Sequence, residues 1–377
     1  MKFVLATDSF KESMTSIEAC KAMESGIKKI IKDAECVKIP IADGGEGTVE
    51  ALVYGTKGKF EEREVTSPIK NKKVKARYGI LGNEETAVIE MAAASGLEIL
   101  KNEERNPLKT TTFGTGELIL DALDKDIKHL IIGIGGSATN DGGVGMLMAL
   151  GVKFYDKDKR EIDVGGEELL KLEKIDISNL DKRLKNIKIE VACDVNNPII
   201  GEEGATKIFG PQKGATPEMV KVLEKALENY TRVIKKDFNL DVTKIKGGGA
   251  AGGLGVAFLV FLNGKLEKGI NLVIKYSGLE KEIKNADFVF TGEGAIDFQT
   301  RFGKTPIGVA NVAKKNGVRV IAFGGKVDSN IGELYKDGID AIFSIMQGVE
   351  PIENALKHGP KNLEITVENV VRLLNIL

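Results

Sequence analysis

The chain has 377 residues, of which 42% are hydrophobic and 29% charged, a composition typical of a globular protein long enough for two domains. Its 54 Lys and Arg residues nearly balance its 55 Asp and Glu residues, so no net charge directs the protein to nucleic acid or to an anionic membrane surface. Three cysteines without a CxxC pair and two histidines argue against a disulfide framework, a thiolate zinc site and a serine–histidine–aspartate triad.

The first elements predict alternating strands and helices. Residues 3–6 form a short apolar run, expected to be a buried strand, and Thr15 with Glu18 forms the capping box of the helix that follows. Residues 37–41 predict a second strand, which ends in a glycine-rich loop before another helix. This order is typical of a parallel sheet with helices on both faces.

The middle of the chain has a different pattern. Residues 75–80 and 86–91 predict a hairpin around Gly82-Asn83. The basic, polar stretch at residues 66–77, which contains Pro68, suits a crossover between domains. The longest apolar stretch, residues 254–262, is too short for a transmembrane helix. Since the apolar run at the N-terminus is also too short for a signal peptide, we expect a cytoplasmic protein with no membrane partner.

The strand–loop–helix order returns towards the C-terminus. Strands are expected at residues 288–291, 318–323 and 341–345, with a helix at residues 305–315. The last helix carries an apolar stripe typical of core packing, formed by Leu363, Val367, Val370, Val371, Leu374 and Leu377.

We therefore expect an α/β fold with a parallel sheet flanked by helices, interrupted by a second, inserted α/β domain. A discontinuous Rossmann-like domain is predicted for residues 1–66 plus 286–377, and the inserted domain for residues 67–285. The active site is expected in the cleft between the domains, at loops that follow the carboxyl ends of parallel strands.

Glycine is over-represented, with 44 in the chain, and it clusters in loops after expected strands. Residues 133–143 and 247–255 lead into apolar helical stretches, so their backbone NH groups could surround phosphates. Lys11 and Lys304 are candidate cations for phosphate charge. Carboxylates that follow expected strands could accept a hydroxyl proton or hold Mg²⁺, or else cap helices: Asp8, Asp43, Asp194 and Asp297.

Two motif tests narrow this chemistry. A Walker A loop is absent, because Phe298 stands where the first glycine before Gly303-Lys304-Thr305 would be. A dinucleotide fingerprint is partly present in residues 133–138, with Asp156 about 20 residues further on. Against it, Asn140-Asp141-Gly142-Gly143 occupies the expected first helical turns. An NAD(P)-dependent hydroxy-acid oxidoreductase and a non-catalytic nucleotide-binding protein are therefore the alternatives to a phosphoryl-transferring enzyme.

Several long motifs identify the chain further. They are Asp8-Ser9-Phe10-Lys11-Glu12-Ser13, Ala42-Asp43-Gly44-Gly45-Glu46-Gly47-Thr48, Gly135-Gly136-Ser137-Ala138-Thr139-Asn140-Asp141-Gly142-Gly143, Ala192-Cys193-Asp194-Val195, Phe209-Gly210-Pro211-Gln212-Lys213-Gly214-Ala215, and Thr291-Gly292-Glu293-Gly294 with Asp297, Gln299, Gly303, Lys304 and Pro306. This set resembles the bacterial glycerate kinase family, the type without a P-loop, over nearly the whole chain. The usual family pattern has Gly where this chain has Glu12.

The resemblance implies ATP-dependent phosphorylation of glycerate with Mg²⁺, with 2-phosphoglycerate as the product. The resemblance does not fix the catalytic base, and we expect Asp194 or Asp297 to accept the hydroxyl proton, with Asp8 and Lys11 as further catalytic residues. Phosphate-binding residues are expected at Gly135, Gly136, Ser137, Ala138, Thr139, Asn140, Gly248, Gly249, Gly252, Gly253 and Lys304. Expected contacts to glycerate come from Ser9, Asp43, Gly44, Gly45, Lys213, Glu293 and Arg301, and expected metal ligands are Asp43 and Asp194.

Overall fold

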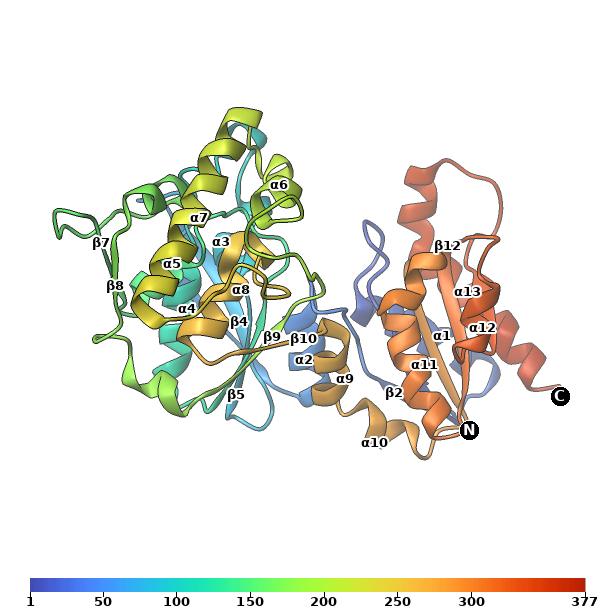
Figure 1. The fold of residues 1–377 in the computed structure, drawn as a ribbon. Helices are drawn as coiled ribbons and strands as arrows, with labels where there is room; N and C mark the ends of the chain where they lie inside the picture. The colour runs from blue at the N-terminus through green and yellow to red at the C-terminus, as the bar shows by residue number, and fades with distance from the viewer. Residues whose placement is uncertain (377) are drawn as a thin grey trace. The chain divides into compact units, whose positions relative to one another are not determined.

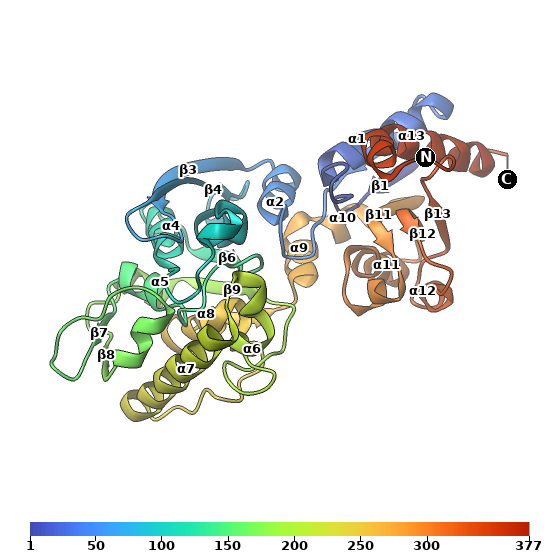
Figure 2. The same cartoon turned by 90° about the horizontal axis from the view of Figure 1, so that it is seen from above.

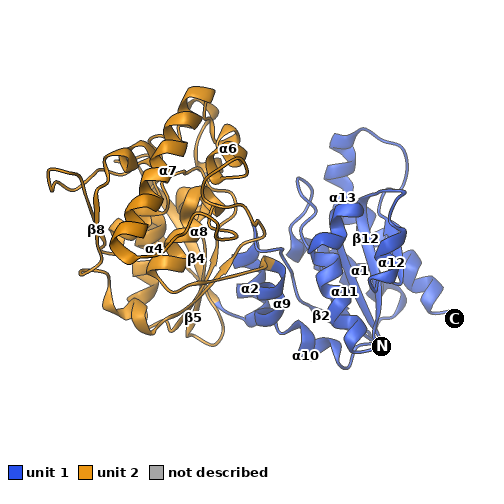
Figure 3. Cartoon of the chain, viewed as in Figure 1, with its two compact units in different colours: residues 1–58, 270–377 blue, residues 59–269 orange. Residues whose placement is uncertain are grey.

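The computed structural model describes residues 1–376, which form two compact α/β units (Figure 1). Unit 1 consists of Met1–Gly58 and the chain from Ile270 onward, and unit 2 of Lys59–Gly269 (Figure 3). The chain therefore passes between units at residues 58/59 and 269/270, not at the expected 66/67 and 285/286.

Unit 1 contains a five-stranded, wholly parallel sheet in the order β13-β12-β11-β1-β2. β1 lies between strands from opposite ends of the sequence, since Phe3 pairs with both Phe288 and Cys36. The strands are β1 (Lys2–Leu5), β2 (Glu35–Lys38), β11 (Phe288–Ile296), β12 (Arg319–Val327) and β13 (Ala341–Ser344).

Helices cover both faces of this sheet, and Figure 2 shows α1 and α13 side by side on one face with α11 on the other. The predicted capping box of α1 is confirmed, because Thr15 and Glu18 each accept the other's backbone NH. The helices of unit 1 are α1 (Ser16–Ile30), α2 (Thr48–Thr56), α9 (Gly269–Ser277), α10 (Leu279–Ile283), the 3-10 helix η6 (Phe298–Phe302), α11 (Thr305–Lys315), α12 (Gly332–Lys336) and α13 (Ile352–Leu374).

The apolar stripe of α13 packs into the core as expected. Leu363, Val367, Val370 and Val371 are buried with residues of α1 and β1, and Leu374 packs against them. Leu377, the last member of the stripe, lies outside the described residues. Pro360 stands inside α13, where it removes one backbone donor.

Unit 2 contains a six-stranded mixed sheet in the order β10-β9-β6-β5-β4-β3. The four strands from β10 to β5 are parallel, whereas β4 pairs antiparallel with both β5 and β3. The strands are β3 (Lys59–Thr66), β4 (Lys73–Ile80), β5 (Thr86–Glu90), β6 (His129–Gly133), β9 (Lys188–Ala192) and β10 (Lys265–Glu267), with a separate pair, β7 (Lys153–Tyr155) and β8 (Lys174–Asp176).

This pairing explains where the predicted boundaries were wrong. β3 pairs with β4 along its whole length, from Lys59 to Thr66, so residues 66–77 form a turn and a strand and are not a crossover. At the other boundary, α9 packs against α11, because a Cβ at Gly308 would meet Ile270 and Ile274. The predicted hairpin between β4 and β5 is confirmed.

The helices of unit 2 pack around its sheet. They are α3 (Ala92–Ser95), α4 (Phe113–Leu123), α5 (Val144–Ala149), α6 (Ala205–Phe209), α7 (Pro217–Phe238) and α8 (Ala250–Phe261), with 3-10 helices η1 (Leu97–Ile99), η2 (Asn102–Glu104), η3 (Gly166–Lys171), η4 (Lys182–Asn186) and η5 (Pro211–Lys213). Among residues 1–376, no helix combines the length and the apolar character that a membrane crossing requires.

Candidate active site

In unit 1, polar side chains gather where β1 and β11 lie side by side. Past the end of β1, the NH of Asp8 donates to the carbonyl of Gly292, at 3.0 Å. This bond places Asp8 next to Glu293 of β11, and the negative charge of Asp8 acts on the Glu293 carboxyl. Asp8 and Glu293 therefore lie together at one edge of the parallel sheet, whereas the expected meeting of Asp8 with Asp43, Asp194 and Asp297 in one cleft stays a prediction.

The Asp8 carboxylate is held by three donors. Its Oδ1 accepts from the NH of Ser9 at 2.7 Å and from the Ser9 hydroxyl at 3.3 Å, and its Oδ2 accepts from the Thr305 hydroxyl at 2.5 Å. Burial, with a smaller contribution from the negative charge of Asp43, nevertheless raises the pKa of Asp8 to about 6 against the effect of these bonds. Asp8 is thus a carboxylate that can exchange a proton near neutral pH.

Glu293 has a similar environment. It is 9% exposed, Thr300 donates to its Oε1 at 2.7 Å, and the Lys304 ammonium lies 3.3 Å from its Oε2. Burial is the main cause that raises the pKa of Glu293 to about 7, while Thr300 and Lys304 oppose the rise. The negative charge of Asp8 also favours the protonated form of Glu293.

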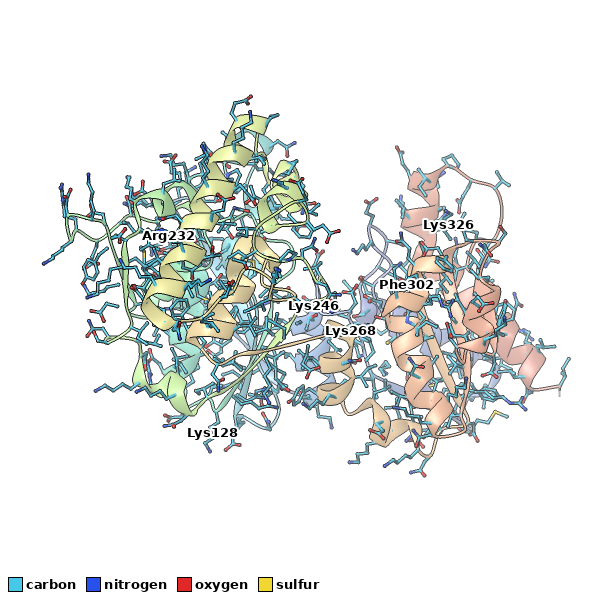
Figure 4. All side chains as sticks on the ribbon, viewed as in Figure 1. Lys128, Arg232, Lys246, Lys268, Phe302 and Lys326 are labelled. Carbon is cyan, nitrogen blue, oxygen red and sulfur yellow. The ribbon has the colours of Figure 1, made fainter. Side chains whose placement is uncertain are left out.

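The side chains of Asp297 and of η6 form contacts within unit 1. Asp297 caps η6, with Oδ1 accepting the NH of Gln299 at 2.7 Å, and it lies 4.0 Å from the Lys304 ammonium. The Arg301 guanidinium pairs with Asp337 at 3.2 Å, so it is not an unpaired cation for a substrate carboxylate. Phe302, labelled in Figure 4, is 67% exposed and packs edge-to-face against Phe298.

The loops after β1 and β2 complete this cluster. Asp43 is exposed and accepts the NH of Gly45 through its Oδ1 at 3.2 Å, whereas Gly44 is buried. Lys11 is exposed, and its backbone N would lie 3.3 Å from a Cβ at Gly294. Glu12 has φ 62, a left-handed conformation that glycine adopts without strain, which explains the glycine of the usual family pattern.

In unit 2, three glycine-rich or acidic loops gather at the carboxyl ends of β6 and β9. These strands pair in parallel, with Gly133 opposite Ala192, so the segments that follow leave the sheet together. In the first loop Gly135 and Gly136 are exposed, while residues 137–140 are buried. The exposed glycines are therefore the part of the loop that a phosphate can reach.

The second glycine run packs against the first loop. The carbonyl of Gly252 accepts the NH of Gly142 at 2.9 Å, and a Cβ on Gly252 would lie 2.2 Å from the carbonyl oxygen of Thr139. Gly248, Gly249, Gly252 and Gly253 are all buried. These glycines were expected to bind phosphate, but they pack against the first loop and offer no exposed surface of their own.

Lys213 lies beneath the same loop. Its ammonium donates to the hydroxyl of Ser137 at 2.7 Å and to the carbonyl of Thr139 at 2.6 Å, and the side chain is 2% exposed. Burial lowers the pKa of Lys213 to about 7, and the negative charge of Asp141 partly opposes this. The expected role of Lys213 in holding the substrate carboxylate does not agree with this buried position.

Asp194 follows β9 and is exposed. Its Oδ1 accepts the NH of Gly269 at 3.1 Å, at the first residue of α9. Asp194 belongs to unit 2 and Asp43 to unit 1, so their joint role as metal ligands stays a prediction. Across residues 1–376, no three His, Cys, Asp or Glu side chains come together as a metal site.

A row of threonines that no motif indicated contacts the first loop. Thr110 donates its hydroxyl to the carbonyl of Ala138 at 2.8 Å, and Thr112 donates both its NH and its hydroxyl to Asp141. Asp141 also accepts the NH groups of Gly143 and Gly145 at the start of α5, so it is a structural cap. The available signal was three consecutive threonines, residues 110–112, directly before α4.

The dinucleotide reading of this loop is not supported by its geometry. α5 begins only at Val144, well after the partial fingerprint. Asp156 closes a turn, with its Oδ1 accepting the NH groups of Asp158 and Arg160 at 2.8 and 2.9 Å. The fold and the loops therefore define a phosphate-handling α/β enzyme with no Rossmann dinucleotide fingerprint and no Walker A loop.

Comparison with known proteins gives the family. Residues 3–375 match the model of the glycerate kinase family, and the chain belongs to that family. It is 51% identical to a glycerate kinase of Haemophilus influenzae, covering 99% of each chain, and 48% identical to the glycerate 2-kinase of Escherichia coli K12, covering 100% of this chain and 98% of the relative. A crystal structure from Salmonella typhimurium LT2 designated glycerate kinase 2 superposes with a TM-score of 0.91 at 49% identity, covering 100% of this chain and 98% of that one.

Proposed function

We propose that this member of the glycerate kinase family transfers the γ-phosphoryl group of ATP to the 2-hydroxyl of glycerate, giving 2-phosphoglycerate and ADP. The observation that carries the proposal is the cluster of Asp8, Glu293 and Lys304, a small polar site at the carboxyl ends of parallel strands in a chain of this family. The full-length similarity to the glycerate 2-kinase of Escherichia coli supports the choice of hydroxyl.

The nucleotide phosphates are assigned to the first glycine loop of unit 2. Gly135 and Gly136 are exposed there, next to buried residues that hold the loop in shape. A phosphate needs backbone NH groups that the chain presents without side-chain obstruction, and glycine allows that approach. The cleft expected between the domains stays a prediction.

Glycerate is assigned to the cluster of unit 1, where its hydroxyl can be deprotonated. In the step we propose, the Asp8 carboxylate accepts the hydroxyl proton as the glycerate oxygen bonds to the γ-phosphorus. The bond from that phosphorus to the β–γ bridging oxygen breaks, and ADP leaves with the electron pair. Asp8 suits this role because its pKa of about 6 leaves it ionised yet basic at neutral pH. Lys304 can balance charge that develops on the phosphoryl oxygens.

Mg²⁺ is the metal that this reaction implies, and the residues of unit 1 fit it in part. Asp43 presents an exposed carboxylate whose negative charge acts on Asp8, a repulsion that a nearby cation would relieve. Mg²⁺ usually binds one or two carboxylates and completes its shell with water and phosphates, so a larger cluster is not required. When bound, it would neutralise charge on the transferring phosphates.

A coupled assay tests the proposal. Purified protein with ATP, Mg²⁺ and glycerate should release ADP, whereas lactate, glycerol and glyoxylate should give little. Enolase uses the 2-isomer alone, so added enolase should form phosphoenolpyruvate without phosphoglycerate mutase. Phosphoenolpyruvate that forms only after mutase is added would identify the 3-hydroxyl as the acceptor and contradict the regiochemistry.

A further inference from the structure

The Lys213 ammonium is buried without an acidic partner. Within residues 1–376 it forms no ion pair, and its hydrogen-bond acceptors are two neutral oxygens, from Ser137 and Thr139. Moving an ammonium out of water is costly unless an opposite charge compensates it. A leucine or methionine would fill the same volume without that desolvation cost. The lysine at this position therefore indicates a role for its charge.

The two acceptors place this charge on the phosphate loop. Ser137 and Thr139 directly follow the exposed Gly135 and Gly136, and Lys213 reaches them from η5, more than seventy residues later in the chain (76 and 74 positions). The bond to the Thr139 carbonyl fixes the backbone, and the bond to Ser137 fixes its side chain. Both bonds constrain the direction in which the loop presents its NH groups.

We propose that Lys213 is a positioning residue for the nucleotide, which holds the loop from Gly135 to Thr139 in its phosphate-binding shape and provides the positive charge that a bound phosphate compensates. The inference rests on the proposed nucleotide site in unit 2. It replaces the earlier assignment of Lys213 to the glycerate carboxylate, and it predicts an effect on nucleotide binding with glycerate binding spared.

Other charged groups around Lys213 do not supply the missing partner. Asp141, on the same loop, acts on Lys213 at a distance, but its carboxylate accepts from Thr112, Gly143 and Gly145. Arg105, whose carbonyl would lie 2.6 Å from a Cβ at Gly214, is a second cation. Lys207 of α6, which packs against η5, pairs with Glu202. The negative partner of the Lys213 ammonium is therefore expected to be an anion from outside the chain.

The direct test is calorimetric titration of the protein with MgADP. Lys213→Met removes both hydrogen bonds while keeping the side-chain length, and we expect a Kd for MgADP raised about tenfold or more, with the KM for glycerate changed less than about twofold. Ser137→Ala should weaken binding less. The double variant should bind about as Lys213→Met does, because Lys213 acts partly through Ser137. Lys128→Met is the matched control, since Lys128 is an exposed lysine at the amino end of β6 (Figure 4).

The outcomes separate this inference from the proposed function. Wild-type protein that does not bind MgADP would contradict the nucleotide site itself. Wild-type binding with an unchanged Kd in Lys213→Met would overturn the role of Lys213 alone, even if the variant melted at a lower temperature. If Lys213→Met does not fold, wild-type titrations at pH 8 in buffers of different ionisation enthalpy decide instead. Proton uptake on MgADP binding is then expected, because a bound phosphate favours the ammonium form, and its absence would overturn the proposal.

Discussion

The hydroxyl of Ser13 donates a 2.6 Å hydrogen bond to the carbonyl oxygen of Leu356 in α13. Leu356 lies four residues before Pro360, which has no NH to donate to it, so the serine satisfies a carbonyl that the helix leaves open. A Cβ at Gly359 would lie 2.0 Å from the same hydroxyl. Ser13, the last residue of the motif that begins with Asp8, thus connects this motif to α13.

Ser13→Ala should therefore lower the free energy of unfolding by about 1 kcal/mol, measured by urea denaturation. In a Pro360→Ala background the helix regains its own donor for Leu356. The effect of Ser13→Ala should then become smaller than in the wild-type background. Equal losses in both backgrounds would show that the bond to Leu356 is not the cause.

Asp8→Asn should reduce kcat with glycerate by about 10²–10⁴-fold, because the amide cannot accept the hydroxyl proton. Since the pKa of Asp8 is raised to about 6, kcat/KM for glycerate in the wild type should fall as the pH drops through about 6. Asp33→Asn, at an exposed position of unit 1, should change neither quantity. A kcat near the wild-type value in Asp8→Asn would return the search for the base to Asp194 and Asp297.

Glu293→Gln should raise the melting temperature at pH 8 by a few degrees while lowering activity. The pKa of Glu293 is about 7 in the folded protein, against about 4.3 unfolded, so the native state favours the protonated form. Its contribution to stability is fully present below about pH 4 and is lost as the pH rises through 7. The gain from Glu293→Gln should therefore vanish by pH 4, whereas Glu280→Gln, exposed on α10, should show no such pH-dependent gain. A gain independent of pH would contradict this reading.

Gly252→Ala should destabilise unit 2 by several kcal/mol and weaken nucleotide binding. At φ +69 a side chain is strained, and its Cβ would lie 2.2 Å from the Thr139 carbonyl oxygen. Gly201→Ala is the control for strain alone, because Gly201 has φ +100 and nothing within 4 Å of the added Cβ. Similar losses of stability in the two variants, measured by denaturant unfolding, would rule out the contact with the loop as the main cause.

The fold was predictable where apolar runs and loop signals agreed. The strand expected at residues 341–345 and the helix expected at residues 305–315 match β13 and α11 to within one residue. The boundary near residue 66 was wrong, since β3 is an edge strand with four consecutive charged residues, 61–64, and lacks an apolar run. Pairing with β4 is a tertiary property that local sequence does not encode.

For the candidate site, residue type was predictable but environment was not. Asp8 and Glu293 stood in motifs, yet their raised pKa values depend on burial and on a neighbouring carboxylate, Asp43 for Asp8 and Asp8 for Glu293. Asp297 turned out to cap η6 and Arg301 to pair with Asp337, since short-range partners compete for the same atoms that a substrate would use. Lys213 was noticed as a cation, but only packing shows that its charge is directed into the loop.

The sheet of unit 1 imposes an order on synthesis. β1 must pair with β11, whose partner residues lie 285 positions later, as for Phe3 and Phe288. When β1 leaves the ribosome, β11 has not yet been synthesised. All of unit 2, in contrast, lies in one continuous segment, residues 59–269. We expect unit 2 to fold first, while β1 has only β2 to pair with and the sheet of unit 1 stays incomplete. Arrested nascent chains ending near residue 300 should protect unit 2 from protease and leave residues 1–58 cleavable.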